Sequence, residues 1–159
     1  MPISPDDFRA ALSRFPSGVT VVTTKNQEGK FHGITVSAFN SVSLEPPLVL
    51  VCLDRATASH QVLSESGIFA VNILSAEQSG LSEHFASMIP DKFDGIEYHL
   101  SEHGLPLLSN CLVNMECRVR NISDGGDHTV FIAEVENAIV NDGDPLLYFR
   151  SNYREIGAP

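Results

Sequence analysis

Short runs of β-branched and apolar residues, separated by turn residues, dominate the chain and predict a mainly β protein. Runs such as GVTVVTT and IFAVNIL have the length and composition of strands. No strand–helix–strand rhythm recurs, so the pattern favours an antiparallel, Greek-key-like β-barrel with two or three short helices. The predicted strands cover residues 18–24, 31–37, 41–44, 48–53, 68–74, 112–122, 128–141 and 146–150.

Three segments carry the signals of helices. Ser4-Pro5-Asp6-Asp7 supplies an N-cap, a proline at the first position and an early acid, and an apolar helical spacing then runs to Phe15 before Pro16. A second helix is predicted over residues 57–66, where Gly67 ends it. A capping box at residues 75–78 opens a third that runs to about residue 87. Residues 88–110 show no clean period, which predicts a long functional or dimer-covering loop.

Composition narrows the class of protein. With 159 residues, 43% of them hydrophobic and 19% charged, the chain suits one globular domain over residues 1–159. The formal charge of −10 argues against nucleic acid or an anionic membrane as a partner. No apolar run is long enough to span a bilayer, and the acidic start does not resemble a secretory signal. We therefore expect a cytoplasmic protein whose three cysteines are reduced, structural thiols.

Several common site motifs are missing. The chain contains no GxGxxG after a strand and no GxxxxGK[ST], so neither a Rossmann site nor a P-loop is signalled. No serine lies in a GxSxG elbow, which weakens a hydrolase interpretation. His99 and His103 are four residues apart, but no third ligand stands out, so no metal site is predicted.

Two segments at strand ends have the chemistry of a ligand site. Residues 33–43 mix hydroxyl and β-branched side chains, and could bond the rim of a planar heteroaromatic ring or form an ordinary edge strand. Residues 54–59 join a strand to a helix and combine Arg55 with the hydroxyls of Thr57 and Ser59. Free N–H groups at a helix start suit a phosphate, although Thr57 or Ser59 could simply cap the helix while Arg55 is solvated.

A third segment delivers a histidine from a tight turn. Gly125-Gly126-Asp127 allows close backbone approach, and His128 follows at the first position of a strand. His128 could donate to an amide or a phosphate of a ligand. A plain hairpin turn with an incidental histidine is the alternative.

The order of these motifs resembles the flavin reductase family with the FMN-binding split-barrel fold. The resemblance extends from about Phe8 to Ile156 and is closest to the small reductase partners of two-component aromatic monooxygenases. It rests on the ordered set FPSGV, TVSAF, SVS, PP, FAVN, DKF, GDH and PLLYFR, at residues 15–19, 35–39, 41–43, 46–47, 69–72, 91–93, 126–128 and 145–150.

The resemblance implies a homodimer with FMN or FAD bound near the subunit interface. The residues that would line the isoalloxazine ring are Thr35, Val36, Ser37 and Ala38, with Ser41 and Ser43 close by. Relatives often have asparagine at the position of Ser37 and serine at that of Ala38, so the resemblance implies that contacts there would be made by the backbone. The ribityl phosphate would be held by Arg55, Thr57 and Ser59, and the flavin tail covered by Phe85, Lys92 and Phe93. His128, the candidate catalytic residue, would meet the nicotinamide dinucleotide.

The implied activity is reduction of FMN or FAD by NADH, with NADPH as a second donor. NADH is favoured because no cluster of arginines is present to pair a 2′-phosphate. Reduced flavin would then diffuse to a partner monooxygenase. Three other functions remain open: a flavin-binding electron carrier, an oxidase similar to pyridoxamine-phosphate oxidase, and a barrel whose dimer interface is its only function.

Overall fold

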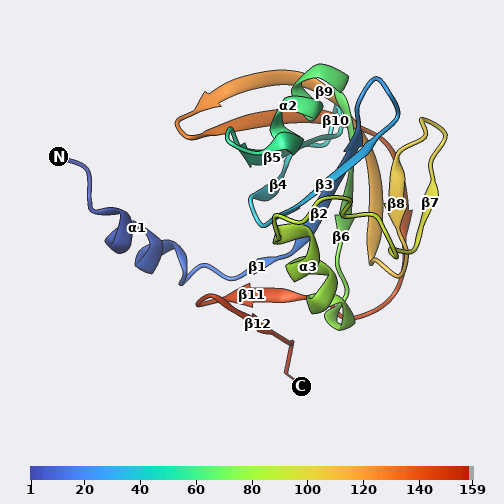
Figure 1. The fold of residues 1–159 in the computed structure, drawn as a ribbon. Helices are drawn as coiled ribbons and strands as arrows, with labels where there is room; N and C mark the ends of the chain where they lie inside the picture. Colours follow the sequence, from blue (N-terminus) through green and yellow to red (C-terminus); the bar gives the residue numbers. More distant parts are fainter. Residues whose placement is uncertain (158–159) are drawn as a thin grey trace.

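One large antiparallel sheet forms the body of the computed structural model, which describes residues 1–157 (Figure 1). Its strand order is β3-β2-β6-β9-β10-β5-β4. The seven strands are β2 (Thr20–Lys25), β3 (Phe31–Val36), β4 (Phe39–Ser43), β5 (Leu48–Asp54), β6 (Ile68–Ile73), β9 (Val113–Gly125) and β10 (His128–Val140). The predicted mainly β, antiparallel architecture is confirmed.

The sheet curls into a barrel because its two edge strands are joined by a very short connection. β3 and β4 lie at opposite ends of the strand order, yet only Ser37 and Ala38 separate them in the chain. The amide of Cys52 in β5 donates to the carbonyl of Ala38 at 3.0 Å, which fixes this corner against β5. A flat sheet would hold the two edges far apart, so the short link requires closure.

Two smaller sheets complete the β structure. β1 (Ser17–Gly18), β11 (Leu147–Phe149) and β12 (Asn152–Arg154) form a three-stranded sheet in the order β1-β11-β12. β7 (Tyr98–Leu100) and β8 (Pro106–Leu108) form a hairpin. This hairpin corrects the prediction of one continuous loop over residues 88–110. Leu105, Leu107 and Leu108 are buried against the chain's own sheet, and strands of three residues are too short for a periodic signal.

The helices begin where the sequence predicts. α1 (Pro5–Leu12) is capped by the Ser4 side chain and ends three residues before Phe15. α2 (Ala58–Ser66) is capped by Thr57 and ends at Gly67, which has the left-handed φ of 67° that favours glycine. The predicted capping box is present, but it opens a 3₁₀ turn, η1 (Ala76–Gln78), before α3 (Ser79–Ala86). None of the helices in residues 1–157 is long and apolar enough to cross a membrane.

The core lies inside the barrel and follows the alternation of its strands. In β5 the side chains of Val49, Val51 and Leu53 are buried, while Asp54 emerges at the end. The same core contains Phe69 and Phe131, both completely buried. Each fully buried side chain of this size stabilises the fold by about 1.5–3 kcal/mol. The cysteines are free thiols, with Cys111 and Cys117 buried and Cys52 half-buried.

Candidate functional site

The three segments with site chemistry meet beside the end of β5. In the register of β5 with β10, Asp54 lies opposite His128, so the β9–β10 turn adjoins the start of α2. The corner formed by Ser37 and Ala38 contacts β5 two residues earlier, through the bond from the Cys52 amide. Three segments that are far apart in the sequence are thereby brought to one end of the barrel, as their assignment to one site requires.

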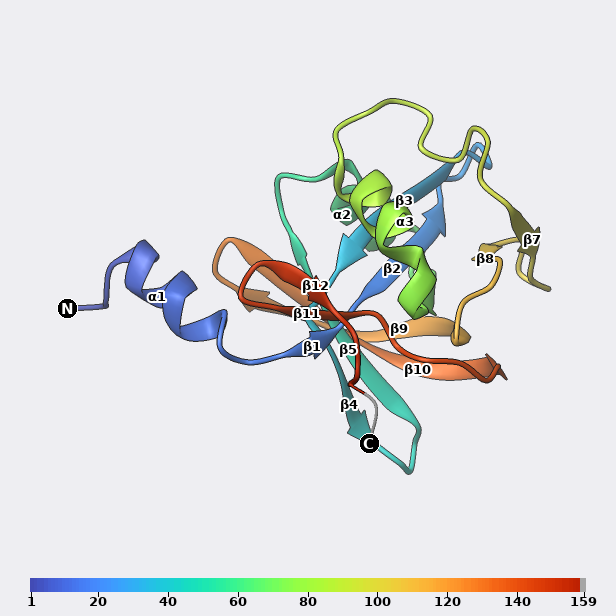
Figure 2. The same ribbon diagram turned by 90° about the horizontal axis from the view of Figure 1, so that it is seen from below.

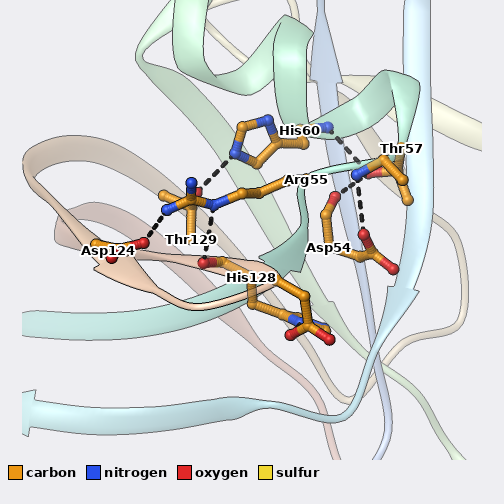
Figure 3. Close-up of polar contacts among 9 residues, drawn as sticks. Asp54, Arg55, Thr57, His60, Asp124, His128 and Thr129 are labelled. Carbon is orange, nitrogen blue, oxygen red and sulfur yellow. Dashed lines mark hydrogen bonds and ion pairs between the residues drawn. The ribbon is translucent and has the colours of Figure 1, made fainter.

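Arg55 is bound to the β9–β10 turn (Figure 3). Its amide donates to the carbonyl of Asp127 at 3.0 Å, and its Nε donates to the carbonyl of His128 at 3.2 Å. Its guanidinium also forms an ion pair with Asp124. The side chain is half exposed and lies over the turn, so Arg55 would have to leave Asp124 before it could hold a phosphate with its full set of donors.

The start of α2 offers unused hydrogen-bond donors. The Thr57 hydroxyl accepts from the amide of His60 at 3.3 Å and donates to the carbonyl of Asp54 at 2.8 Å, so it caps the helix (Figure 3). Within residues 1–157, the amides of Ala58 and Ser59 and the Ser59 hydroxyl form no hydrogen bond. Ser59 is only 6% exposed, yet it lines a pocket. Free N–H groups at a helix N-terminus are a favourable environment for an anion.

That pocket has a volume of about 780 Å³ and lies between β3, the start of α2 and the segment that follows α3. It brings together four residues that the sequence assigned to the flavin phosphate and tail: Thr57, Ser59, Lys92 and Phe93. The volume is in the range of cofactor sites. Arg55, Thr35, Val36, Ser37, Ala38, Ser41 and Ser43 do not line it.

Lys92 fixes the segment after α3 to the barrel. Its ammonium donates to the carbonyls of Gly33 and Phe85, at 3.1 and 2.9 Å, and its own carbonyl is bonded by His84 Nε2 at 2.6 Å. Burial of the ammonium lowers the pKa of Lys92. Lys92 therefore places a positive charge at the pocket wall while its donors hold the wall in position.

The position of Phe85 corrects the prediction that this side chain covers the flavin tail. The side chain is completely buried and does not line the pocket, so it offers no surface to a ligand. Instead it packs beneath Gly33, where an added Cβ would lie 2.7 Å from its ring, and against Phe93, with ring centroids 5.2 Å apart. Phe85 therefore supports the pocket from below. This difference could not be predicted from the sequence, because Phe85 and Phe93 are both aromatic residues of one segment.

In the segment assigned to the flavin ring, some side chains contact the rest of the protein and others are exposed to solvent. The Thr35 hydroxyl donates to the carbonyl of Ser82 at 2.6 Å, and the Val36 side chain is part of the barrel core. Ser37, Ala38 and Ser41 are exposed, and Ser43 is half-buried. A planar ring at this corner would therefore meet backbone groups of Thr35 and Val36 rather than their side chains.

His128 is half exposed at the start of β10, and its Nδ1 is 2.7 Å from a carboxylate oxygen of Asp127. This hydrogen bond, followed by the charge of the imidazole, lowers the pKa of Asp127. A proton on Nδ1 leaves Nε2 as an acceptor, and a fully protonated ring leaves it as a donor. Asp127 thus orients the ring, a role that the sequence analysis did not assign to it.

Sequence reasoning also missed the residues behind the site. His60 reaches across from α2 and its Nε2 is 2.8 Å from the Thr129 hydroxyl in β10, which joins the start of α2 to the strand that carries His128 (Figure 3). A histidine three residues after a helix cap was the available signal. Within residues 1–157, no group of three or more His, Cys, Asp or Glu side chains is arranged to hold a metal.

Comparison with known proteins identifies the family. The family model described as "Flavin reductase like domain" matches residues 12–157. The chain belongs to this family. It is 42% identical over 141 residues to an FMN reductase (NADH) of Agrobacterium fabrum, covering 89% of this chain and 80% of that protein. It is 39% identical to the reductase subunit HsaB of a flavin-dependent monooxygenase of Rhodococcus jostii, covering 97% and 79%.

Solved structures of flavin reductases share the fold. An NADH:FAD oxidoreductase of Streptomyces globisporus, solved in complex with NAD and FAD fragments, superposes with a TM-score of 0.92 at 35% identity. The match covers 99% of this chain and 97% of that one. The predicted split-barrel fold is confirmed by this likeness.

Proposed function

We propose that this member of the flavin reductase family transfers a hydride from NADH to FMN or FAD. The observation that carries the proposal is the convergence of the ring, phosphate and His128 segments beside the end of β5, in a chain whose family match spans residues 12–157. Loss of the hydride would convert NADH to NAD⁺, and the flavin that accepts this hydride together with one proton from solvent would be fully reduced. The two cofactors supply this chemistry when bound, and the protein supplies position.

Three sets of groups on this chain have separate tasks in binding the two cofactors. The Ser59 hydroxyl and the free amides of Ala58 and Ser59 bind the flavin phosphate, with Lys92 adding positive charge to the same pocket. The backbone at Ser37 and Ala38 bonds the rim of the ring. His128, oriented by Asp127, binds the nicotinamide dinucleotide. None of these tasks requires a protein acid in the hydride step.

We also propose that the active unit is a homodimer. α1 extends away from the barrel in both ribbon views, and none of its residues is buried (Figures 1 and 2). Phe8, Leu12 and Phe15 are all more than half exposed. Apolar side chains of this size need a covering surface, and a second copy would supply one. Light scattering of an active sample should give twice the chain mass of 17.3 kDa, and a fully active monomer would contradict the dimer.

Reduced flavin from this chain would serve a separate monooxygenase. The relative in Rhodococcus jostii is a reductase subunit of such a system. A reductase of this kind must release its product, so the flavin should exchange during turnover. We place this work in the cytoplasm, where the three free thiols would stay reduced.

The decisive experiment is a spectrophotometric assay of NADH oxidation with FMN, FAD and riboflavin added in turn. Turnover that depends on added flavin supports the proposal. Flavin that co-purifies in stoichiometric amount and ignores NADH would indicate an electron carrier instead. No oxidation of NADH or NADPH with any flavin would refute the reductase function.

A further inference from the structure

A carboxylate of the chain itself lies at the start of α2. Asp54, the last residue of β5, accepts a hydrogen bond from the amide of Ala56 through its side-chain Oδ1, at 2.8 Å. Its backbone carbonyl accepts from the amide and the hydroxyl of Thr57, the helix cap, at 3.2 and 2.8 Å. Because the N-terminus of a helix attracts anions, the carboxylate of Asp54 takes up part of the same favourable environment that the proposed flavin phosphate would use.

No cation of the protein neutralises this carboxylate. In the part of the chain that the structure describes, Asp54 forms no ion pair. Arg55 is its neighbour in sequence, but Figure 3 shows the guanidinium extending toward Asp124 and away from the carboxylate of Asp54. Asp54 is exposed, and it lines the same pocket as Thr57 and Ser59. An unpaired negative charge is therefore part of the wall in which the phosphate would be bound.

This charge opposes the groups that attract the phosphate. A phosphate monoester carries about two negative charges near neutral pH, which the free amides of Ala58 and Ser59 and the ammonium of Lys92 would favour. The carboxylate of Asp54 has the same sign as the phosphate and repels it, so part of that attraction is cancelled. Riboflavin has the ring and the ribityl chain of FMN without the phosphate, and the repulsion does not act on it.

We propose that Asp54 is a specificity-determining residue of the flavin site, which weakens the binding of the FMN phosphate and so keeps FMN an exchangeable substrate. The inference rests on the proposed function, because it concerns the same phosphate site. A reductase that supplies reduced flavin to another protein has to release that flavin, and repulsion by Asp54 favours release. Asp54 acts on the binding and exchange of the flavin and takes no part in hydride transfer.

The test is Asp54→Asn, which removes the charge and keeps a side-chain oxygen that can accept from the Ala56 amide. FMN and riboflavin are titrated into the flavin-free protein by calorimetry without NADH. Because Asp54 is exposed and solvent screens its charge, the FMN dissociation constant should fall only about three- to tenfold, and the riboflavin constant should not change. The gain should shrink at about 1 M salt, where the screening length is roughly 3 Å. FMN release, followed by stopped flow, should slow by a similar factor.

A matched control and three other outcomes decide the inference. Asp142→Asn removes the same charge from an exposed residue that does not line this pocket, and it should alter neither flavin constant. An equal gain from Asp142→Asn would overturn the inference, since net charge would then be the cause. An unchanged FMN constant in Asp54→Asn, or an equal change for FMN and riboflavin, would overturn it as well, because the carboxylate would then only shape the turn.

NADH is the other ligand that Asp54 could meet, because Asp54 pairs with His128 in the register of β5 with β10. A change in the NADH Michaelis constant of Asp54→Asn, with both flavin constants unaltered, would therefore also refute the assignment to the flavin phosphate. Failure of the proposed function is distinct from all of these outcomes. It would appear as no oxidation of NADH with any flavin, whereas the titrations measure flavin binding without NADH.

Discussion

Replacing Arg55 with alanine tests which of two ligands depends on the guanidinium. The resemblance assigns Arg55 to the flavin phosphate, but the side chain is bound to Asp124 and to the carbonyl of His128. If these contacts hold the β9–β10 turn in place, Arg55→Ala will impair the nicotinamide site that we propose for this turn. We expect the Michaelis constant for NADH to rise and the binding of FMN and riboflavin to change equally little.

The expected rise in the NADH Michaelis constant follows from how exposed the contacts of Arg55 are. The side chains of Arg55 and Asp124 are 47% and 80% exposed, so solvent screens their ion pair to about 0–1 kcal/mol. The hydrogen bond to the His128 carbonyl adds about 1 kcal/mol. Loss of both allows an effect of about 1–2 kcal/mol, which corresponds to roughly five- to thirtyfold in the NADH constant.

Asp124→Ala is the matched control. It removes the ion pair and leaves the hydrogen bond from Arg55 Nε to the His128 carbonyl in place. The NADH Michaelis constant should therefore rise by less than in Arg55→Ala. The double variant should be no worse than Arg55→Ala alone, because both substitutions act on one contact. Steady-state kinetics with NADH varied, using FMN and then riboflavin as acceptor, gives all of these values.

A phosphate role would give the opposite pattern. Arg55→Ala would then weaken FMN and spare riboflavin, and Asp124→Ala would leave FMN unchanged or strengthen it by freeing the guanidinium. Ser59→Ala provides the internal reference, since it should weaken FMN and not riboflavin in either case. Observation of the FMN-selective loss in Arg55→Ala would refute the assignment to the turn.

Three further predictions address the remaining contacts. Asp127→Asn should raise the NADH Michaelis constant about three- to tenfold with little change in flavin affinity, since it weakens the bond that orients His128; unchanged kinetics would remove that role. Asn72→Ala should cost about 2–4 kcal/mol in urea denaturation, because the buried amide bonds both β2 and the β8 hairpin. Burial raises the pKa of Cys111 to about 11 and of Cys117 to about 12, so the folded protein keeps protons that the unfolded chain loses. Stability should therefore fall above about pH 9, by on the order of 1 kcal/mol per pH unit per thiol, and Cys117→Ala should reduce this slope.

Local signals in the sequence predicted the elements well where one residue type decides the geometry. The serine cap before Pro5, the Thr57 cap and Gly67 each mark a helix end through their own side chain or backbone. Runs of β-branched and apolar residues likewise predicted the longer strands. The β7–β8 hairpin gave no such signal. It is held by Asn72, whose side-chain oxygen accepts from the Leu108 amide 36 residues away, and a long-range bond leaves no periodicity in the sequence.

The site was predictable as a set of segments and less so as a set of side chains. Thr57, Ser59, Lys92 and Phe93 line one pocket, and their roles toward a flavin remain predictions. Which side chain faces the ligand depends on packing that the sequence does not display. Phe85 is turned into the core while Phe93, eight residues later, lines the pocket. From the sequence, Arg55 could have contacted a phosphate or solvent. In the structure its guanidinium forms an ion pair with Asp124 in a turn that is distant in the sequence.

The hydrophobic core fixes the position of the site through the register of two strands. Thr129, Phe131 and Ala133 of β10 are buried opposite Leu53, Val51 and Val49 of β5. Because side chains alternate between the two faces of a strand, a shift of one residue would expose Phe131 and turn His128 inward. Exposing Phe131 alone would cost about 1.5–3 kcal/mol, and the neighbouring positions would add to it. The pairing of His128 with Asp54, and hence the approach of the histidine to the start of α2, is therefore set by apolar residues that never touch a ligand.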